Sequence, residues 1–348
     1  MQSLDELQVP LLLYQHHAAC RIKNKENLQM RHQDILDLLE VGRSAERRQN
    51  GEKARSGTGE VSERACRAYE MLQIMSHGRY QAPNGTWVDV KEAMRQAVAR
   101  SFFFSESLWS PSPFLDMPPP YTTDISVRQW TTLSAMQDLS TNLLGMYTIG
   151  VLNCASQKNP GGGFTNGAGA QEESLARSSA LYPCLTRFWN QFYRHDVGVF
   201  HHGIIVSPGV PVVRNDSGNL LDRPYPVHFV TAAAPNRDCA GVSEQKATAA
   251  LRERVARVLD VFARYEVTDV VLGAWGCGAF KNDTATVASI FKEHLSGSFH
   301  GRFRSVVFAI LGASEAQVFA NEFITDVVQP VSEASKRGVV PHRKAPKP

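Results

Sequence analysis

The chain of 348 residues carries 37 Lys and Arg against 34 Asp and Glu, a formal net charge of +3, and 43% of its residues are hydrophobic. This composition excludes a chain that is disordered throughout, because it provides enough apolar surface to offset the entropy lost on folding. A membrane-spanning protein and a collagen-like one are also excluded, since no apolar run reaches 18 residues and the 25 glycines show no three-residue period.

The positive charge is concentrated near the C-terminal end of the sequence. Residues 336–348 hold five basic residues and no acidic one, and residues 1–55 have a net charge of +1, which leaves −3 for residues 56–335. A protein that binds a nucleic-acid duplex needs clustered Lys and Arg on its folded part. We therefore expect no direct nucleic-acid partner, and residues 329–348 are predicted to form a basic, flexible tail.

Residues 1–58 are polar and rich in both charges, which predicts a largely disordered leader with one short helix at 35–41. The acidic start and the short apolar stretch at 9–14 are not typical of a secretory signal. Six cysteines occur singly, without CxxC or Cys/His metal spacing. We expect a cytoplasmic or nuclear protein that is not secreted, has no membrane partner and holds no metal.

Residues 59–129 are predicted to form a helical N-terminal lobe. Apolar residues recur every three or four positions from 61 to 75, and Gly78 ends this helix. A turn at 83–85, a short strand at 87–90 and a helix at 91–99 follow. Five prolines between 110 and 120 prevent regular structure and mark a junction with the next domain.

Residues 130–328 alternate continuous apolar runs with helical patterns. Strands are predicted at 146–154, 199–207, 227–234, 268–274 and 305–311, and helices at 172–193 (interrupted by Pro183), 243–265, 284–295 and 315–323. Continuous Val, Ile and Leu runs are typical of strands that helices cover on both sheet faces. The predicted fold class is therefore α/β, a three-layer α/β/α domain.

Two glycine-rich loops each follow a predicted strand. The first, 153–173, contains a triple glycine and ends in Gln-Glu-Glu, and the second, 273–283, reads GAWGCGAFKND. Glycines at strand ends let backbone N–H groups approach a phosphate, and the next helix N-terminus favours the anion. Neither loop satisfies GxxxxGK[ST] or GxGxxG, so ATPase and dehydrogenase functions are not supported. One such loop alone could be a tight turn, but two suggest a ligand with a diphosphate.

Glu172 and Glu173 begin the helix that is predicted after the first loop. Acidic residues are common at helix starts, where they complement the helix dipole, but their position after the triple glycine suggests a site. Neighbouring side chains on a helix point about 100° apart, so the two cannot flank one bond like the carboxylate pairs of most glycosidases. We expect one to bind sugar hydroxyls and the other to protonate a leaving oxygen.

The triple glycine followed after seven residues by Gln-Glu-Glu resembles the signature of the poly(ADP-ribose) glycohydrolases. The stretches NPGGGFTNGAGAQEESLARSSALYPCL, PNR, LGAWGCGAFKND and GRYQAPNGTWVDV resemble the bacterial and fungal branch of that family, and together they cover about residues 60–325. The resemblance implies a macrodomain with a mixed central sheet that binds ADP-ribose. It also implies hydrolysis of the ribose–ribose O-glycosidic bonds of poly(ADP-ribose) from chain ends.

The resemblance also implies roles for individual residues. Glu173 would be the catalytic acid, protonating the leaving ribose oxygen and then activating water, and Glu172 would be the second catalytic carboxylate, binding hydroxyls of the scissile ribose. The implied ADP-ribose-binding residues are Asn159, Gly161, Gly162, Gly163, Gln171, Gly276, Cys277, Gly278, Ala279, Phe280 and Asn282. The glycines of both loops would cradle the diphosphate, and Asn159 would take a ribose-binding role because Ser156 stands where macrodomains commonly carry Asn. No metal and no cofactor are needed.

Two alternative functions stay open at this point. A related hydrolase on the same fold removes single ADP-ribose units from proteins, and a macrodomain of another class binds ADP-ribose without cleaving anything. The Gln-Glu-Glu sequence argues against binding alone, because a binding module does not need an acid. We expect a monomer whose substrates are poly(ADP-ribose) and ADP-ribosylated proteins and whose product is ADP-ribose. Trp130, Trp189 and Trp275 are interpreted as packing residues, and Cys277 has no neighbouring His that would make it a nucleophile.

Overall fold

The computed structural model describes residues 59–328 apart from 113–114, 116, 143–147, 156–157, 194–200, 240 and 325–326. The predicted leader at 1–58 and the predicted basic tail at 329–348 lie outside the described residues, and so does Ser156. In the part that is described, no helix combines the length and the apolar character needed to cross a bilayer.

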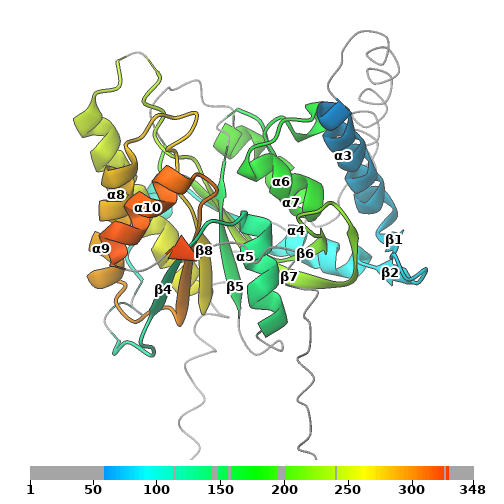
Figure 1. The fold of residues 1–348 in the computed structure, drawn as a ribbon, viewed down its shortest axis with the longest axis horizontal. Helices are drawn as coiled ribbons and strands as arrows, with labels where there is room; N and C mark the ends of the chain where they lie inside the picture. The colour runs from blue at the N-terminus through cyan, green and yellow to red at the C-terminus, as the bar shows by residue number, and fades with distance from the viewer. Residues whose placement is uncertain are drawn as a thin grey trace, which may run out of the picture.

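An eight-stranded mixed sheet forms the centre of the molecule (Figure 1), in the order β10-β4-β9-β8-β5-β7-β6-β3. The strands from β10 to β7 run parallel, and β6 and β3 continue the sheet antiparallel. The bounds are β3 Phe102–Phe104, β4 Asp124–Arg128, β5 Ile149–Cys154, β6 Ile204–Arg214, β7 Leu220–Ala232, β8 Asp269–Leu272, β9 Ser305–Ala309 and β10 Val327–Val328, with a separate hairpin of β1 Arg79–Gln81 and β2 Trp87–Asp89.

Helices cover both faces of this sheet. Their bounds are α3 Gly59–His77, α4 Lys91–Arg100, α5 Thr132–Asn142, α6 Gln171–Ser178, α7 Leu181–Thr186, α8 Glu244–Arg264, α9 Thr284–Ser296 and α10 Ala313–Phe323, with short helical turns η2 Glu106–Leu108, η4 Phe164–Asn166 and η5 Trp189–Tyr193. Side chains cap two of the helices that flank the site: Ser243 accepts from Lys246 N at α8, and Asp283 accepts from Thr286 N at α9. These caps satisfy backbone donors that would otherwise lack a partner in the first turn.

Two hydrophobic cores, one on each face, hold the layers together. Side chains alternate along a strand, so Val151 of β5 packs into the core shared with α3 to α7, while Leu152 packs into the core shared with α8 to α10. The central strands are buried on both faces, which is why their sequences are continuously apolar. The three-layer α/β/α fold with a mixed central sheet is confirmed.

The helix predicted over 172–193 is interrupted, but not at Pro183. Ser179 leaves the helical conformation with φ −144° and ψ 166° and forms a bridge to Val212 of β6. Pro183 instead lies in the first turn of α7, where its missing N–H removes no helical hydrogen bond. Tertiary pairing with the sheet, rather than proline, ends α6.

The boundary predicted between a helical lobe and the α/β domain at 129/130 cuts through the sheet. β3 pairs with β6, and β4 pairs with β9, so residues 59–129 contribute two strands to the same sheet as residues 130–328. β3 has only three residues and β4 only five. Such short strands carry too little periodicity to be identified from sequence, and we correct the helical lobe to a helical and β-strand extension of one sheet.

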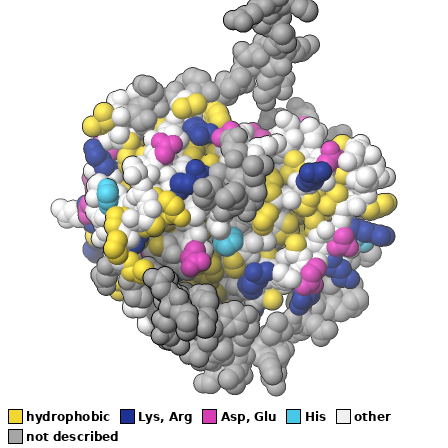
Figure 2. Space-filling model, turned by 90° about the horizontal axis from the view of Figure 1, so that it is seen from below, with side chains coloured by type: hydrophobic (Ala, Val, Ile, Leu, Met, Phe, Trp, Pro, Cys, Tyr) yellow, Lys and Arg dark blue, Asp and Glu magenta, His cyan; other side chains and the backbone are white. Residues whose placement is uncertain are grey.

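Seen from below (Figure 2), the described part of the surface carries Lys and Arg side chains interspersed with Asp and Glu. Hydrophobic side chains on this face are divided into separate patches by polar atoms. A face with both signs of charge mixed in this way lacks the single-sign field that attracts a nucleic-acid backbone.

Candidate active site

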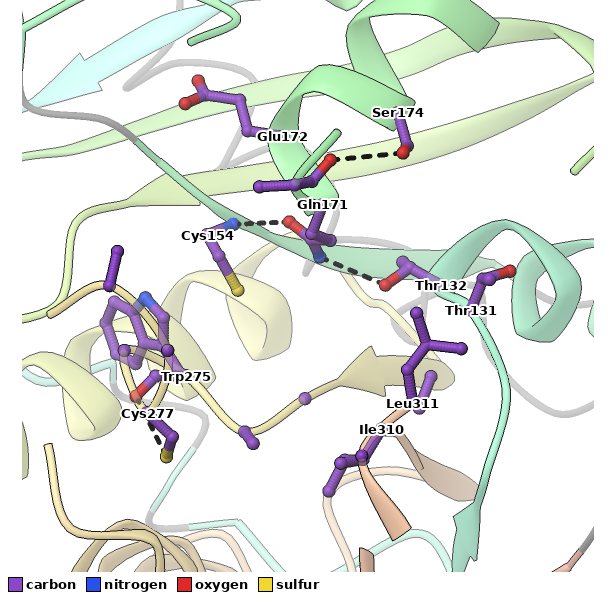
Figure 3. A pocket seen from close by; sticks show the side chains of 18 of the residues that line it. Thr131, Thr132, Cys154, Gln171, Glu172, Ser174, Trp275, Cys277, Ile310 and Leu311 are labelled. Carbon is purple, nitrogen blue, oxygen red and sulfur yellow. Dashed lines mark hydrogen bonds between the residues drawn. The ribbon is translucent and has the colours of Figure 1, made fainter. Parts of the chain in front are cut away.

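A pocket of about 550 Å³ lies where the parallel strands end. The segments that follow β4, β9, β8, β5 and β7 line it, together with the start of α6. In the close view (Figure 3), Thr131, Ile310 and Leu311 lie on one side of the pocket and Trp275 and Cys277 on the other. This is the place where open α/β sheets bind ligands.

Gln171 fixes the start of α6 to the end of β5. Its side-chain amide accepts from Cys154 N at 2.8 Å and donates to Leu152 O at 2.7 Å, and it also donates to Thr132 Oγ1 at 3.3 Å (Figure 3). Gln171 lines the pocket, but its amide oxygen and nitrogen are both engaged within the protein. It therefore positions the two glutamates that follow it.

The Glu172 carboxylate is buried at the pocket wall, 3% exposed. Its Oε1 accepts from Gly161 N at 3.1 Å and from Asn153 Nδ2 at 3.4 Å, and Asn153 is itself held by Thr231 Oγ1 at 3.2 Å. These donors compensate the loss of water around a buried carboxylate.

The Glu173 carboxylate has one oxygen fixed and the other open. Oε1 accepts from Gly163 N at 2.9 Å, whereas Oε2 is buried and has no hydrogen-bond partner among the described residues. Gly162, at φ +60°, lets the carboxylate approach the loop, because a Cβ on this residue would lie 2.2 Å from Glu173 Oε1. An unsatisfied buried carboxylate oxygen is a feature that needs a functional explanation.

The triple glycine uses its N–H groups inside the protein. Gly161 N donates to Glu172, Gly162 N to Asn159 O at 3.0 Å, and Gly163 N to Glu173. The expected role of these glycines was to cradle a diphosphate. In the structure Gly161 N and Gly163 N hold the two carboxylates instead, because the loop folds back onto the start of α6.

The second glycine loop keeps donors available. Asn282 Nδ2, at the end of this loop, donates to Gly276 O within the loop at 3.1 Å and to Pro235 O, in the segment after β7, at 2.8 Å. Gly276 has φ +78°, and a Cβ there would lie 2.6 Å from Asn282 Nδ2. The N–H groups of residues 278 to 280 have no acceptor in the described part of the chain, and residues 276 to 280 all line the pocket. Such a run of exposed N–H groups is suited to an anion.

Two cysteines line the pocket without forming a nucleophilic pair. Burial raises the pKa of the Cys154 thiol to about 12 and that of the Cys277 thiol to about 11. Both thiols are therefore protonated near neutral pH, when a nucleophile would need the thiolate. Within the described residues, no group of three or more His, Cys, Asp and Glu is arranged to hold a metal ion.

Most predicted site residues are brought together, and some pocket residues were not predicted. Of the implied ligand-binding set, Gln171 and residues 276–280 line the pocket, whereas the triple glycine, Asn159 and Asn282 are not among its lining residues. The lining residues that were not predicted include Trp130, Thr131, Thr132, Leu133, Cys154, Ala155, Ile310, Leu311, Gly312 and Glu315. Most of them follow β4 or β9, whose adjacency no local sequence signal shows. Asn153, which holds Glu172, could have been noticed in the sequence as a polar residue directly after an apolar strand run.

Comparisons with known proteins show which family the chain resembles. The profile of the microbial-type PARG catalytic domain matches residues 68–215. A crystal structure of poly(ADP-ribose) glycohydrolase from Thermomonospora curvata is 38% identical, covers 75% of this chain and 99% of that one, and superposes with a TM-score of 0.68. A second structure of that enzyme, with the same identity and coverage, contains the inhibitor ADP-HPD. The poly(ADP-ribose) glycohydrolase of Deinococcus radiodurans in complex with ADP-ribose is 35% identical over 66% of this chain and 96% of its own, with a TM-score of 0.58. No curated protein matched the sequence.

Proposed function

The chain belongs to the microbial-type poly(ADP-ribose) glycohydrolase family, and from this premise we propose how its pocket cleaves the polymer. It is a glycosidase that hydrolyses poly(ADP-ribose). The observation that carries our mechanism is the Glu173 carboxylate, with Oε1 held by Gly163 N and Oε2 buried without a partner among the described residues. We assign Oε2 as the atom that delivers the proton to the leaving ribose oxygen.

Proton delivery by Glu173 breaks the bond between the ribose C1″ and the leaving oxygen, leaving an oxocarbenium-like ribose. Glu173, now a carboxylate, takes a proton from the attacking water and is restored to the acid form, so no net proton is consumed. Glu172, held by Gly161 N and Asn153, binds the hydroxyls of the same ribose and places negative charge near the developing cation.

The diphosphate of the bound unit is assigned to the second loop. This assignment is supported by the N–H groups of residues 278 to 280, which have no acceptor among the described residues. It is also supported by Asn282, whose side-chain amide fixes the loop by donating to Pro235 O and Gly276 O. Phe280 lines the pocket at this loop and is assigned to the distal ribose. Gly161 N and Gly163 N already donate to the two carboxylates, so these glycines position Glu172 and Glu173 for the ligand and do not bind its diphosphate themselves.

We further propose action at chain ends and a monomeric active unit. A pocket of about 550 Å³ is in the range of small-ligand pockets, which supports binding of one ADP-ribose unit at a time. ADP-ribosylated proteins are the proposed carriers of the polymer, and ADP-ribose is the proposed product.

The test compares wild type with Glu173→Gln on labelled poly(ADP-ribose) and on a mono-ADP-ribosylated protein. We expect wild type to release ADP-ribose from the polymer from the first time points and Glu173→Gln to lose at least about 100-fold in kcat, the usual range for a lost general acid. The variant should still bind ADP-ribose in calorimetry, because the second loop is intact. Equal turnover by both proteins would overturn the assignment of Glu173, early release of oligomers would overturn exo action, and release from the mono-modified protein alone would favour a mono-ADP-ribosyl hydrolase.

A further inference from the structure

Arg177 is a buried arginine on α6, one turn after Glu173, the proposed general acid. It is only 6% exposed, it is not among the residues that line the pocket, and the proposed mechanism gives it no role. Burying a guanidinium has a free-energy cost that its hydrogen bonds must offset. The contacts of Arg177 therefore indicate why the fold keeps a cation at this position.

The Arg177 guanidinium holds the end of the first glycine loop. Its Nη1 donates to Ala168 O at 2.6 Å, and its Nη2 makes a longer contact to Ser174 Oγ at 3.5 Å. The Ser174 hydroxyl in turn donates to Ala170 O at 3.2 Å. Arg177 thus ties residues 168–170, which lead into α6, to the body of that helix.

The loop residue that Arg177 holds is also connected to the carboxylate of Glu173. Ala168 N donates to Gly163 O at 3.3 Å, and Gly163 N donates to Glu173 Oε1 at 2.9 Å. A Cβ on Gly163 would lie 3.2 Å from the Ala168 Cβ, so these two loop residues are in close contact. The hydrogen bonds therefore run from Arg177 through the loop to Glu173, and α6 closes the circuit between the two.

Arg177 and Glu173 also interact through their charges. They are four residues apart on α6 and so lie on the same face of the helix. Burial lowers the pKa of Arg177 to about 10, and the Glu173 carboxylate opposes this shift. The guanidinium therefore stays protonated at neutral pH and keeps all of its donors for the loop.

The backbone of Arg177 is anchored independently of its side chain. Arg214 Nε, on β6, donates to Arg177 O at 3.3 Å. Arg214 itself donates to Glu70 and to Gly218 O, each at 2.7 Å. Because these contacts fix the end of α6 to the sheet, a substitution of the Arg177 side chain should act mainly on the 163–170 loop.

We propose that Arg177 is a positioning residue for the general acid, because it holds the loop whose Gly163 N fixes Oε1 of Glu173. With Oε1 fixed, Oε2 keeps one direction toward the leaving oxygen, and small displacements of a reacting group lower the rate strongly. The inference rests on the proposed function, because it needs Glu173 to deliver the proton. Since the diphosphate is assigned to the second loop, Arg177 should affect the rate of cleavage and not the binding of the polymer.

The experiment is a double-mutant cycle on labelled poly(ADP-ribose) with wild type, Arg177→Gln, Glu173→Gln and the double variant. We expect Arg177→Gln to lower kcat about tenfold, as for one lost hydrogen bond to a charged group, and to change KM by less than about twofold. The kcat of the double variant should equal that of Glu173→Gln within about twofold, because no acid is left for Arg177 to position. A purely structural role would lower kcat in both backgrounds.

Two further variants control for stability. Arg304 pairs with the fully buried Asp269 at the start of β8, at the opposite end of the sheet from the pocket, so Arg304→Gln should lower the free energy of unfolding without changing kcat. Arg177→Lys guards against a Gln variant that fails to fold, because it keeps the charge and the stem but lacks the paired Nη groups. It should lower kcat about threefold and have no effect in the Glu173→Gln background.

The outcomes separate this inference from the proposed function. Wild-type kcat in a folded Arg177→Gln or Arg177→Lys protein would overturn the positioning role, and so would an equal loss of kcat in the wild-type and Glu173→Gln backgrounds. In both cases a large loss in Glu173→Gln alone would still uphold the proposed mechanism. Equal turnover by wild type and Glu173→Gln would overturn the proposed function, and this inference with it.

Discussion

Replacing Gly162 with Ala tests whether the first glycine loop sets the position of the catalytic carboxylate. An added Cβ would lie 2.2 Å from Oε1 and 2.7 Å from Cδ of Glu173, closer than any real contact. The carboxylate must then move and lose the 2.9 Å hydrogen bond from Gly163 N. A hydrogen bond to a charged group contributes about 1.5–3 kcal/mol, so we expect kcat to fall by about 10- to 150-fold.

The same substitution also strains the backbone, and a control separates the two effects. Gly162 has φ +60°, where an L-residue costs about 1–2 kcal/mol. Gly85, in the turn between β1 and β2, has φ +84°, and a Cβ there would meet nothing within 4 Å. Gly85→Ala should therefore lose a similar free energy of unfolding in urea titrations but keep wild-type turnover of poly(ADP-ribose). Wild-type kcat in a folded Gly162→Ala protein, or an equal loss of kcat in Gly85→Ala, would refute the reasoning.

Other parts of the structure give further expectations. Asn282→Ala removes the amide that holds the second loop through Gly276 O and Pro235 O, so KM for poly(ADP-ribose) should rise about tenfold in steady-state kinetics. An unchanged KM would contradict a role of Asn282 in shaping this loop. Since burial raises the pKa of the Cys277 thiol to about 11, iodoacetamide at neutral pH should alkylate the exposed Cys66 before Cys277. Equal alkylation rates of the two cysteines in mass spectrometry would contradict the protection of Cys277 by burial. Burial lowers the pKa of His228 to about 4, whereas an unfolded His titrates near 6.5. As the pH falls, the unfolded chain therefore takes up the proton on this histidine before the folded chain does. The contribution of neutral His228 to the free energy of unfolding is complete above pH 6.5 and is lost as the pH falls toward 4. The difference in unfolding free energy between wild type and His228→Gln should shrink by about 2 kcal/mol from pH 7 to pH 5 in urea titrations, and a constant difference would contradict the shift.

The location of the candidate site could be predicted from local sequence, because its signature lies within one short stretch. The triple glycine and the Gln-Glu-Glu sequence pointed to Glu172 and Glu173, and the structure places both, buried, at the wall of the pocket. Sequence could not show that the glycine N–H groups point at those carboxylates. That contact joins Gly161 to Glu172 and Gly163 to Glu173, and it exists only because the loop returns to the start of α6.

The outer strands of the sheet, and the part of the pocket that follows β4 and β9, could not be predicted from local sequence. β4 pairs with β9 at a separation of about 180 residues, and this pairing brings Trp130 and Leu311 to the same end of the pocket. β3 is added next to β6 by three consecutive phenylalanines, a pattern with no period to detect. Strand order decides which residues meet, and in a mixed sheet neighbouring strands are often far apart in the chain.

The two glycine loops resolve an electrostatic conflict between the catalytic carboxylates and an anionic ligand. Two buried carboxylates would repel a diphosphate bound in the same pocket. In the first loop Gly161 N and Gly163 N donate to Glu172 and Glu173 and so offset their charge, while the N–H groups of residues 278 to 280, which have no acceptor among the described residues, are left for the diphosphate that we propose to bind there. All of these donors are backbone N–H groups rather than Lys or Arg side chains, which explains how residues 56–335, with a net charge of −3, can bind a strongly anionic polymer.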